Sequence, residues 1–128
     1  MILAVALGSA IGGVARLLLG AAVQQRLGPG FPVGTLVINI TGSLLLGFFM
    51  RLALATSAIS PEIRGFLTTG LCGGYTTFST FTYETMALLN DGELGRAGTY
   101  VAASVALALL GVYLGAAAAG GLIALRQR

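Results

Sequence analysis

The sequence has no histidine, a single cysteine and few charged residues, and each shortage excludes a class of site. Charged side chains make up 9% of its 128 residues, whereas soluble domains carry about 25%. Because Cys72 is alone and histidine is absent, an internal disulfide and a Cys/His metal site are both excluded. No pair of carboxylates and no activated nucleophile gathers in the apolar segments, so an enzyme is not expected.

The net charge of +3 comes entirely from arginine. Such sparse positive charge does not favour nucleic-acid binding, whereas arginines at helix ends anchor membrane proteins at the lipid headgroups. Hydrophobic residues make up 56% of the chain, and the mean hydropathy is +0.94. A soluble monomer of this length cannot hide so much apolar surface from water. We therefore predict an integral membrane protein that has the lipid bilayer as a partner.

Four apolar segments, each long enough to cross a bilayer as a helix, fill nearly the whole chain. No basic residue precedes the first apolar segment, so we expect a retained span rather than a cleaved signal peptide. The prediction is an all-α membrane protein that forms a single domain over residues 1–128. Its four spans are expected at about residues 2–23, 33–55, 63–89 and 96–125.

The third segment contains a stretch, residues 70–81, that is unlike an ordinary membrane helix. It has the sequence GLCGGYTTFSTF, in which Gly73 and Gly74 are followed by a run of hydroxyls that includes Thr80. Each glycine costs roughly 1 kcal/mol of helix stability relative to alanine. Interrupted backbone at membrane depth survives only where it is buried in protein or lines a watery cavity, and it directs helix ends and carbonyls at ions. We therefore predict that the third helix is broken in mid-membrane, near residues 72–77, at an ion site.

Two polar residues in the first two spans each have two interpretations. Arg16 follows Gly8 and Gly12 in a stripe of small residues, which lets another helix approach closely. Arg16 either anchors the span or bonds to neighbouring carbonyls, or it attracts anions into a water-filled mouth. Asn39, on one face with Thr35, either bonds to a neighbouring helix or donates its amide to a passing anion. On the sequence alone, both choices stay open.

Aromatic and hydroxyl side chains follow the predicted break. Phe78 and Phe81 lie on one helical face, a spacing that is typical of packing in a core. The edge of a phenyl ring is partly positive, however, and it can stabilise a small anion that has lost its water. Tyr100 and Ser104 begin a stripe on the fourth span and are candidates for a short polar track beside the rings. Glu84, one turn beyond Phe81, is left without a role.

The arginines give only a weak preference for one orientation in the membrane. The side that holds both termini carries four arginines and the opposite side carries two: Arg51, Arg64, Arg126 and Arg128, against Arg26 and Arg96. A chain with so small a bias can insert both ways, and two copies can then form an antiparallel dimer around a two-fold axis in the membrane plane. The carbonyls of the two breaks would face one another across this axis and form a cation site.

Three motifs, together with the order and length of the four segments, resemble those of the CrcB/Fluc fluoride channels. They are Gly12-Gly13-x-x-Arg16, Gly34-Thr35-Leu36-x-x-Asn39-x-x-Gly42, and GGYTTFSTF from Gly73 to Phe81. The resemblance implies a fluoride-selective channel of the bacterial plasma membrane that exports fluoride passively and protects the cell from its toxicity. It also implies an antiparallel dual-topology dimer, formed by two identical copies or with an oppositely oriented paralogue.

The same resemblance implies roles for single residues. The main-chain carbonyls of Gly73 and Thr76 match those that bind a structural sodium ion at the dimer centre, and Phe78 and Phe81 match an aromatic box. The anion pathway is expected to comprise Asn39, Phe78, Phe81, Tyr100, Ser104 and Thr80, with Arg16 and Thr35 in vestibule or structural positions.

Two other functions remain as alternatives. A small proton-coupled multidrug transporter can also be an antiparallel four-span dimer, but it needs a carboxylate deep in the first helix. This chain has no carboxylate before Glu62. A non-transporting assembly subunit would use the glycine stripes for packing alone, and it would show no conductance in liposomes.

Overall fold

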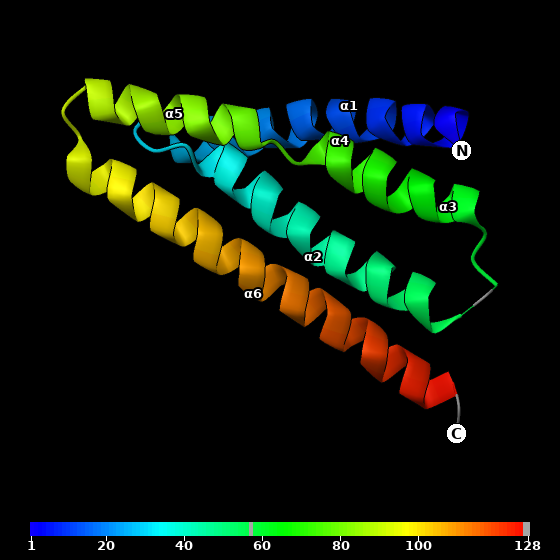
Figure 1. The fold of residues 1–128 in the computed structure, drawn as a ribbon. Coiled ribbons are helices and arrows are strands. Elements are labelled where there is room, and N and C mark those ends of the chain that lie inside the picture. Colours follow the sequence, from blue (N-terminus) through cyan, green and yellow to red (C-terminus); the bar gives the residue numbers. More distant parts are fainter. Residues whose placement is uncertain (57, 127–128) are drawn as a thin grey trace.

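The computed structural model describes residues 1–56 and 58–126, which form helices joined by short turns (Figure 1). Over these ranges the protein is all-helical and has no strand, which confirms the predicted all-α class. Arg128, counted above with the arginines of one side, lies outside the described residues. The elements are α1 (Ile2–Leu27), α2 (Val33–Ala55), α3 (Pro61–Gly65), the π-helix η1 (Phe66–Cys72), α4 (Gly73–Tyr75), α5 (Phe78–Asn90) and α6 (Leu94–Arg126).

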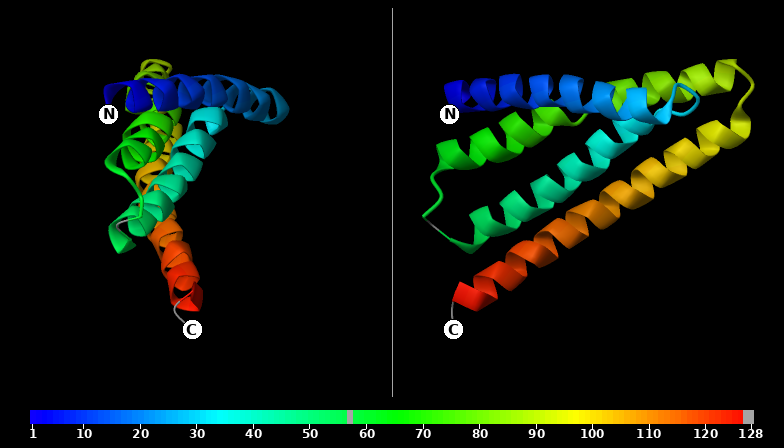
Figure 2. Two further views of the ribbon diagram at one scale, coloured as in Figure 1. Left: turned by 90° about the vertical axis from the view of Figure 1, so that its right-hand side faces the viewer. Right: turned by 180° about the vertical axis from the view of Figure 1, so that it is seen from behind.

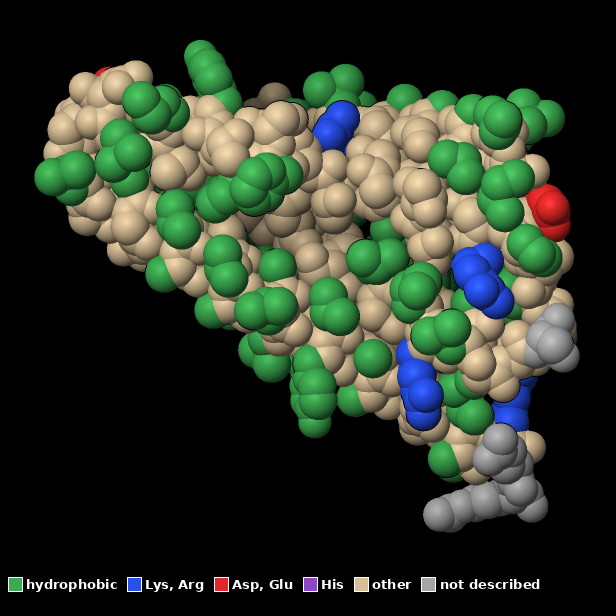
Figure 3. Space-filling model, viewed as in Figure 1, with side chains coloured by type: hydrophobic (Ala, Val, Ile, Leu, Met, Phe, Trp, Pro, Cys, Tyr) green, Lys and Arg blue, Asp and Glu red, His purple; other side chains and the backbone are tan. Residues whose placement is uncertain are grey.

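Three helices are long and apolar enough to cross a membrane: α1, α2 and α6. The sequence predicts four such segments, but the third apolar segment is divided among shorter elements, none of which has the required length. The long helices also extend past their expected limits, since α1 continues to Leu27 and α6 begins at Leu94. Apolar side chains cover much of the molecular surface (Figure 3), as a protein surrounded by lipid requires.

The third segment is interrupted at Thr76 and Thr77. Thr76 has φ −80° and ψ 160°, and Thr77 has φ −150° and ψ 114°, so both residues are extended between α4 and α5. Gly73 and Gly74, in contrast, are helical. Gly74 is needed for packing, because a Cβ atom there would lie 2.6 Å from the carbonyl oxygen of Ser9. Gly74 therefore permits close contact with α1, and the two threonines supply the interruption.

The small-residue stripe of α1 lies directly against the first half of this interrupted segment. A Cβ atom on Gly8 would collide with the carbonyl oxygen of Phe66, and one on Gly12 would collide with that of Leu71. Both glycines are buried. The prediction that this stripe admits a second helix is confirmed, and its partner is η1 together with α4.

Gly12→Ala should lower the free energy of unfolding by roughly 1–3 kcal/mol, because the new methyl group has no room beside the Leu71 carbonyl and the Tyr75 amide. Gly13→Ala is the matched control, since nothing lies within 4 Å of a Cβ atom at that position. Thermal unfolding of both purified variants in detergent measures the difference. Equal stability of the two variants would contradict the packing shown here.

The helices converge at the end that holds the α1–α2 and α5–α6 turns and splay apart towards the ends of α2 and α6 (Figure 2). α2 lies at the centre, where it contacts α1, the interrupted segment and α6. Contact with α6 is close, because Cβ atoms on Gly47 or Gly115 would collide with the carbonyl oxygens of Val112 or Leu44. This arrangement leaves open the space between the interrupted segment and α6, over one face of α2.

Candidate functional site

The extended backbone at Thr76 and Thr77 is held by side chains from two other helices. Asn39 of α2 bonds to Thr77 twice: its Nδ2 donates to the Thr77 carbonyl at 3.1 Å, and its Oδ1 accepts from the Thr77 amide at 2.8 Å. Arg16 of α1 donates from Nη1 to the Thr76 carbonyl at 3.3 Å. Arg16 and Asn39 therefore both donate to the backbone at the interruption, where backbone groups have lost their helical partners.

These bonds support one of the two interpretations that the sequence left open for each residue. Asn39 does bond to a neighbouring segment, and so does Arg16. The amide of Asn39 has two hydrogens, and one of them is accounted for by Thr77. Because Asn39 also lines a cavity, the second hydrogen leaves it able to donate to an anion as well.

The larger part of the predicted anion pathway lines one cavity, which has a volume of about 330 Å³. The cavity lies beside α2, between the interrupted segment and α6, and most of its wall is apolar. The predicted site residues in its lining are Asn39, Gly73, Thr76, Phe78, Phe81 and Ser104. The structure thus brings together residues from three separate segments of the chain. Ala108, one turn after Ser104, continues the wall without a hydroxyl.

Ser104 is the one side chain of this lining whose polar atom is buried without a partner. The residue is 7% exposed, and its Oγ has no hydrogen-bond partner among the residues described. A buried hydroxyl without a bond costs free energy, and proteins satisfy nearly all such groups. The Ser104 hydroxyl therefore remains available to a hydrogen-bond acceptor that enters the cavity.

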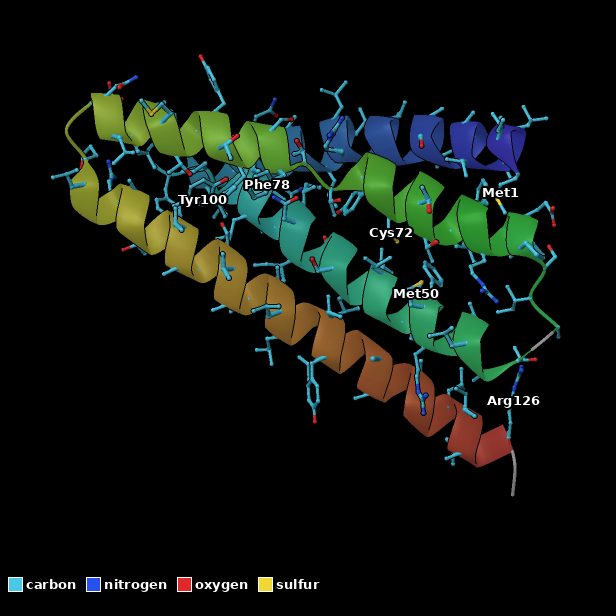
Figure 4. All side chains as sticks on the ribbon, in the orientation of Figure 1. Met1, Met50, Cys72, Phe78, Tyr100 and Arg126 are labelled. Carbon is cyan, nitrogen blue, oxygen red and sulfur yellow. The ribbon has the colours of Figure 1, made fainter. Side chains whose placement is uncertain are left out.

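Three aromatic rings follow one another beside this hydroxyl. The centroids of Phe78 and Phe81 are 5.4 Å apart, and those of Phe81 and Tyr100 are 5.2 Å apart, with tilted planes in both pairs. Figure 4 places Phe78 and Tyr100 in the space between α5 and α6. Phe81 is only 9% exposed, whereas Phe78 is 76% exposed on the single chain. Phe78 and Phe81 line the cavity, and the partly positive edge of a phenyl ring suits a small anion.

Glu84, which the sequence analysis left without a role, holds Tyr100 and Thr35 together. Thr35 donates to Oε1 of Glu84 at 2.8 Å, and the Tyr100 hydroxyl donates to Oε2 at 2.6 Å. Tyr100 is completely buried, so its hydroxyl points at Glu84 rather than into the cavity. One feature of the sequence could have predicted this role: Glu84 is the only carboxylate within the apolar third segment. A carboxylate buried in such a segment needs hydrogen-bond donors.

Tyr100→Phe should lower the free energy of unfolding by about 1.5–3 kcal/mol, since it removes one of the two donors to the Glu84 carboxylate. Tyr113→Phe is the matched control, because Tyr113 lies on the same helix and is 70% exposed. The measurement is the unfolding midpoint of both variants in detergent. If Tyr100→Phe is as stable as the control, the bond to Glu84 does not hold this corner of the fold.

Arg16, Thr35 and Thr80, three further predicted residues, line a second cavity of about 450 Å³, whereas Tyr100 lines neither cavity. Thr77 also contributes to the wall of the second cavity. Thr77 caps the N-terminus of α5 by accepting the Thr80 amide, and its hydroxyl donates to that of Thr80 at 3.0 Å. The Asn39–Thr77 pair lies at the boundary, because Asn39 lines the first cavity and Thr77 the second.

The sequence analysis assigns a cation to the main-chain carbonyl oxygens of Gly73 and Thr76. These are suitable ligands, since hard cations prefer oxygen. Gly73 is exposed on the single chain. The Thr77 amide, which a continuous helix would direct at the Gly73 oxygen, donates to Asn39 instead. The Thr76 oxygen accepts from Arg16 and keeps a second lone pair. Within residues 1–56 and 58–126, no cluster of Cys, Asp or Glu side chains offers an alternative metal site.

Comparison with known proteins identifies relatives over almost the whole chain. The sequence profile described as "CrcB-like protein, Camphor Resistance (CrcB)" matches residues 3–116. A protein of Geobacter sulfurreducens named fluoride-specific ion channel FluC is 51% identical over 92% of this chain and 95% of its own length. A protein of the same name from Rhizobium meliloti is 47% identical over 91% of this chain and 93% of its own length. Another, from a strain of Thermus thermophilus, is 50% identical over 94% of each chain. The chain belongs to the CrcB family.

Proposed function

We propose that this chain forms a fluoride-selective ion channel that lets fluoride leave the cytoplasm passively. Its relatives at about 50% identity are named fluoride-specific ion channels, and the chain is accordingly not an enzyme. The observation that carries the proposal is the buried, unpartnered Ser104 hydroxyl, which lines one cavity with Asn39 and the two phenylalanines. These groups offer hydrogen-bond donors and positive ring edges, and they offer no negative charge.

The mechanism follows from the strong hydration of fluoride. The anion must exchange its water for protein groups that bind it well enough to enter and weakly enough to leave. The Ser104 hydroxyl, the second hydrogen of the Asn39 amide and the edges of Phe78 and Phe81 supply such groups along one wall. Fluoride enters cells as neutral HF and ionises inside, so a passive pore for the anion is enough to remove it.

Arg16 and the threonines of the second cavity form the vestibule of this pathway. The guanidinium is half-buried and faces hydroxyls of Thr35, Thr77 and Thr80, which line the same cavity. A fixed positive charge in a low-dielectric mouth raises the local concentration of anions. Arg16 therefore attracts fluoride while it also bonds to the interruption.

The functional unit is an antiparallel dual-topology dimer in the bacterial plasma membrane. The third segment spans the bilayer in two halves, α3–η1–α4 and α5, that meet at mid-depth. A second copy, or an oppositely oriented paralogue, covers the open side of the first cavity. The exposure of Phe78 on the single chain supports this, because a ring that lines an anion path needs a second wall.

Sodium at the two-fold axis would be held by the carbonyls of Gly73 and Thr76 from both copies. When bound, the ion would supply a positive charge that offsets the repulsion between these carbonyl dipoles. The contribution of this chain is to present those oxygens without helical partners. Asn39 and Arg16 bond to the extended backbone at Thr77 and Thr76, directly after the helical Gly73.

A fluoride-electrode assay on liposomes that contain only this chain tests the proposal. We expect rapid fluoride efflux when an ionophore dissipates the membrane potential, and no comparable efflux of chloride. Absence of any flux would indicate an assembly subunit or a need for a paralogue. Efflux of a cationic dye driven by a pH gradient would indicate a proton-coupled transporter, although the described α1 carries no carboxylate.

A further inference from the structure

A pocket with one arginine in a mostly apolar lining lies at the splayed end of the molecule, away from both cavities of the anion pathway. It has a volume of about 410 Å³ and lies between the last turns of α2 and α6, beside the α2–α3 linker. Its lining includes Leu52, Ala55, Ile59, Leu122, Ile123 and Arg126. Figure 4 shows the Arg126 side chain directed from the end of α6 towards the end of α2.

Two further arginines lie at the same end. Arg51 is exposed on α2 and its Nε lies 3.9 Å from the position of a Cβ atom on Gly120, so it lies across α6. Arg64 donates from Nη2 to the carbonyl of Ala53 at 3.2 Å, and its Nε is buried without a partner in the described chain. Figure 3 shows positive side chains on the part of the surface where the molecule splays towards its C-terminal end.

Nothing in the described part of the chain neutralises these three arginines. Glu62 is the acidic residue of this end, and no ion pair joins it to any of them within residues 1–56 and 58–126. The opposite end differs, because there Arg96 pairs with Glu93 at 3.7 Å and Asp91 lies close by in the chain. Within residues 1–56 and 58–126, the positive charge at the splayed end therefore has no ion-pair partner.

We propose that this pocket binds the phosphate of an anionic phospholipid. The last turns of membrane helices lie at the depth of the lipid headgroups, and basic pockets between such helices bind anionic headgroups. The guanidinium of Arg126 lines the pocket, and those of Arg51 and Arg64 lie at the same end of the molecule. A guanidinium matches a phosphate in charge and hydrogen-bonding geometry. The apolar wall of Leu122 and Ile123 accommodates the start of an acyl chain. A free phosphate ion offers the same charged group but would leave this wall without a partner, so the occupant is a lipid.

The test uses the full-length protein in a non-ionic detergent with phosphatidylglycerol, phosphatidylcholine or inorganic phosphate. Phosphatidylglycerol should raise the thermal unfolding midpoint, and the other two should not. The variant is Arg51→Gln with Arg126→Gln, because these exposed side chains make no hydrogen bond in the described structure. Its apparent dissociation constant for phosphatidylglycerol should rise by about thirtyfold, or about fivefold for each arginine.

The control variant, Arg26→Gln with Arg96→Gln, removes the same charge from the opposite end and should bind within about twofold of wild type, since its one ion pair is exposed. If both variants bind phosphatidylglycerol equally weakly, binding depends on net charge alone, and the proposal is overturned. An equal shift with inorganic phosphate or with phosphatidylcholine would also overturn it. Native mass spectrometry of wild type gives an independent result, because the protein should retain phosphatidylglycerol in preference to phosphatidylcholine, and equal retention would refute the site.

Discussion

Phe81→Ile should reduce fluoride flux by at least about tenfold and leave the protein folded. Phe81 is buried at the centre of the aromatic row, between Phe78 and Tyr100, and it lines the first cavity. Isoleucine keeps most of the apolar volume but has no ring quadrupole, so a dehydrated anion loses a partly positive edge. The fluoride-electrode assay, normalised to the amount of protein in the liposomes, measures the change.

Phe48→Ile is the control for Phe81→Ile. Phe48 packs edge-on against Phe49 and is absent from the lining of both cavities of the pathway. It should keep wild-type flux, whereas Phe78→Ile should impair flux as Phe81→Ile does, because both rings line the same cavity. Wild-type flux in both cavity variants would mean that the rings only pack against their neighbours.

The membrane class and the long helices could be predicted because composition and apolar length determine them. The stripe of Gly8 and Gly12 was also informative, since small residues four apart on a helix define a face that a neighbour can approach. The exact residues of the interruption could not be predicted from propensity. Gly73 and Gly74 have the lower helix propensity but are helical, with Gly74 packed against α1, and Asn39 holds Thr77 extended.

The sequence did not show which groups are hydrogen-bonded to one another in the site. The sequence predicted a possible partner for Asn39 and left Glu84 without a role, and the partners lie 38 residues from Asn39 and 16 and 49 residues from Glu84. Gln24 is a similar case, because it donates to the Phe31 carbonyl and accepts the Gly34 amide, both at 2.9 Å, and so fixes the α1–α2 turn. Only the packing of the helices determines which backbone group faces such a side chain.

Asn39→Ala should have the largest effect of any single change, because it affects both the fold and the pathway. It leaves the amide and the carbonyl of Thr77 without the two bonds that Asn39 provides. An unsatisfied buried polar group costs about 1–3 kcal/mol, so the loss of unfolding free energy should be about 2–6 kcal/mol for the pair. Fluoride flux should fall as well, since the cavity wall loses its amide donor. Unfolding in detergent and fluoride efflux from liposomes measure the two effects.

Asn39→Asp separates the two roles of this residue. The aspartate retains an oxygen for the Thr77 amide, so part of the stability lost in Asn39→Ala should return. The Thr77 carbonyl stays without its donor, because the second carboxylate oxygen can only accept. The amide donor is absent, however, and a negative charge now faces the cavity, so fluoride flux should remain at least about tenfold below wild type. Asn90→Ala, at the exposed end of α5, should change neither quantity. Recovery of flux together with stability in Asn39→Asp would show that Asn39 only holds the interruption and does not bind the anion.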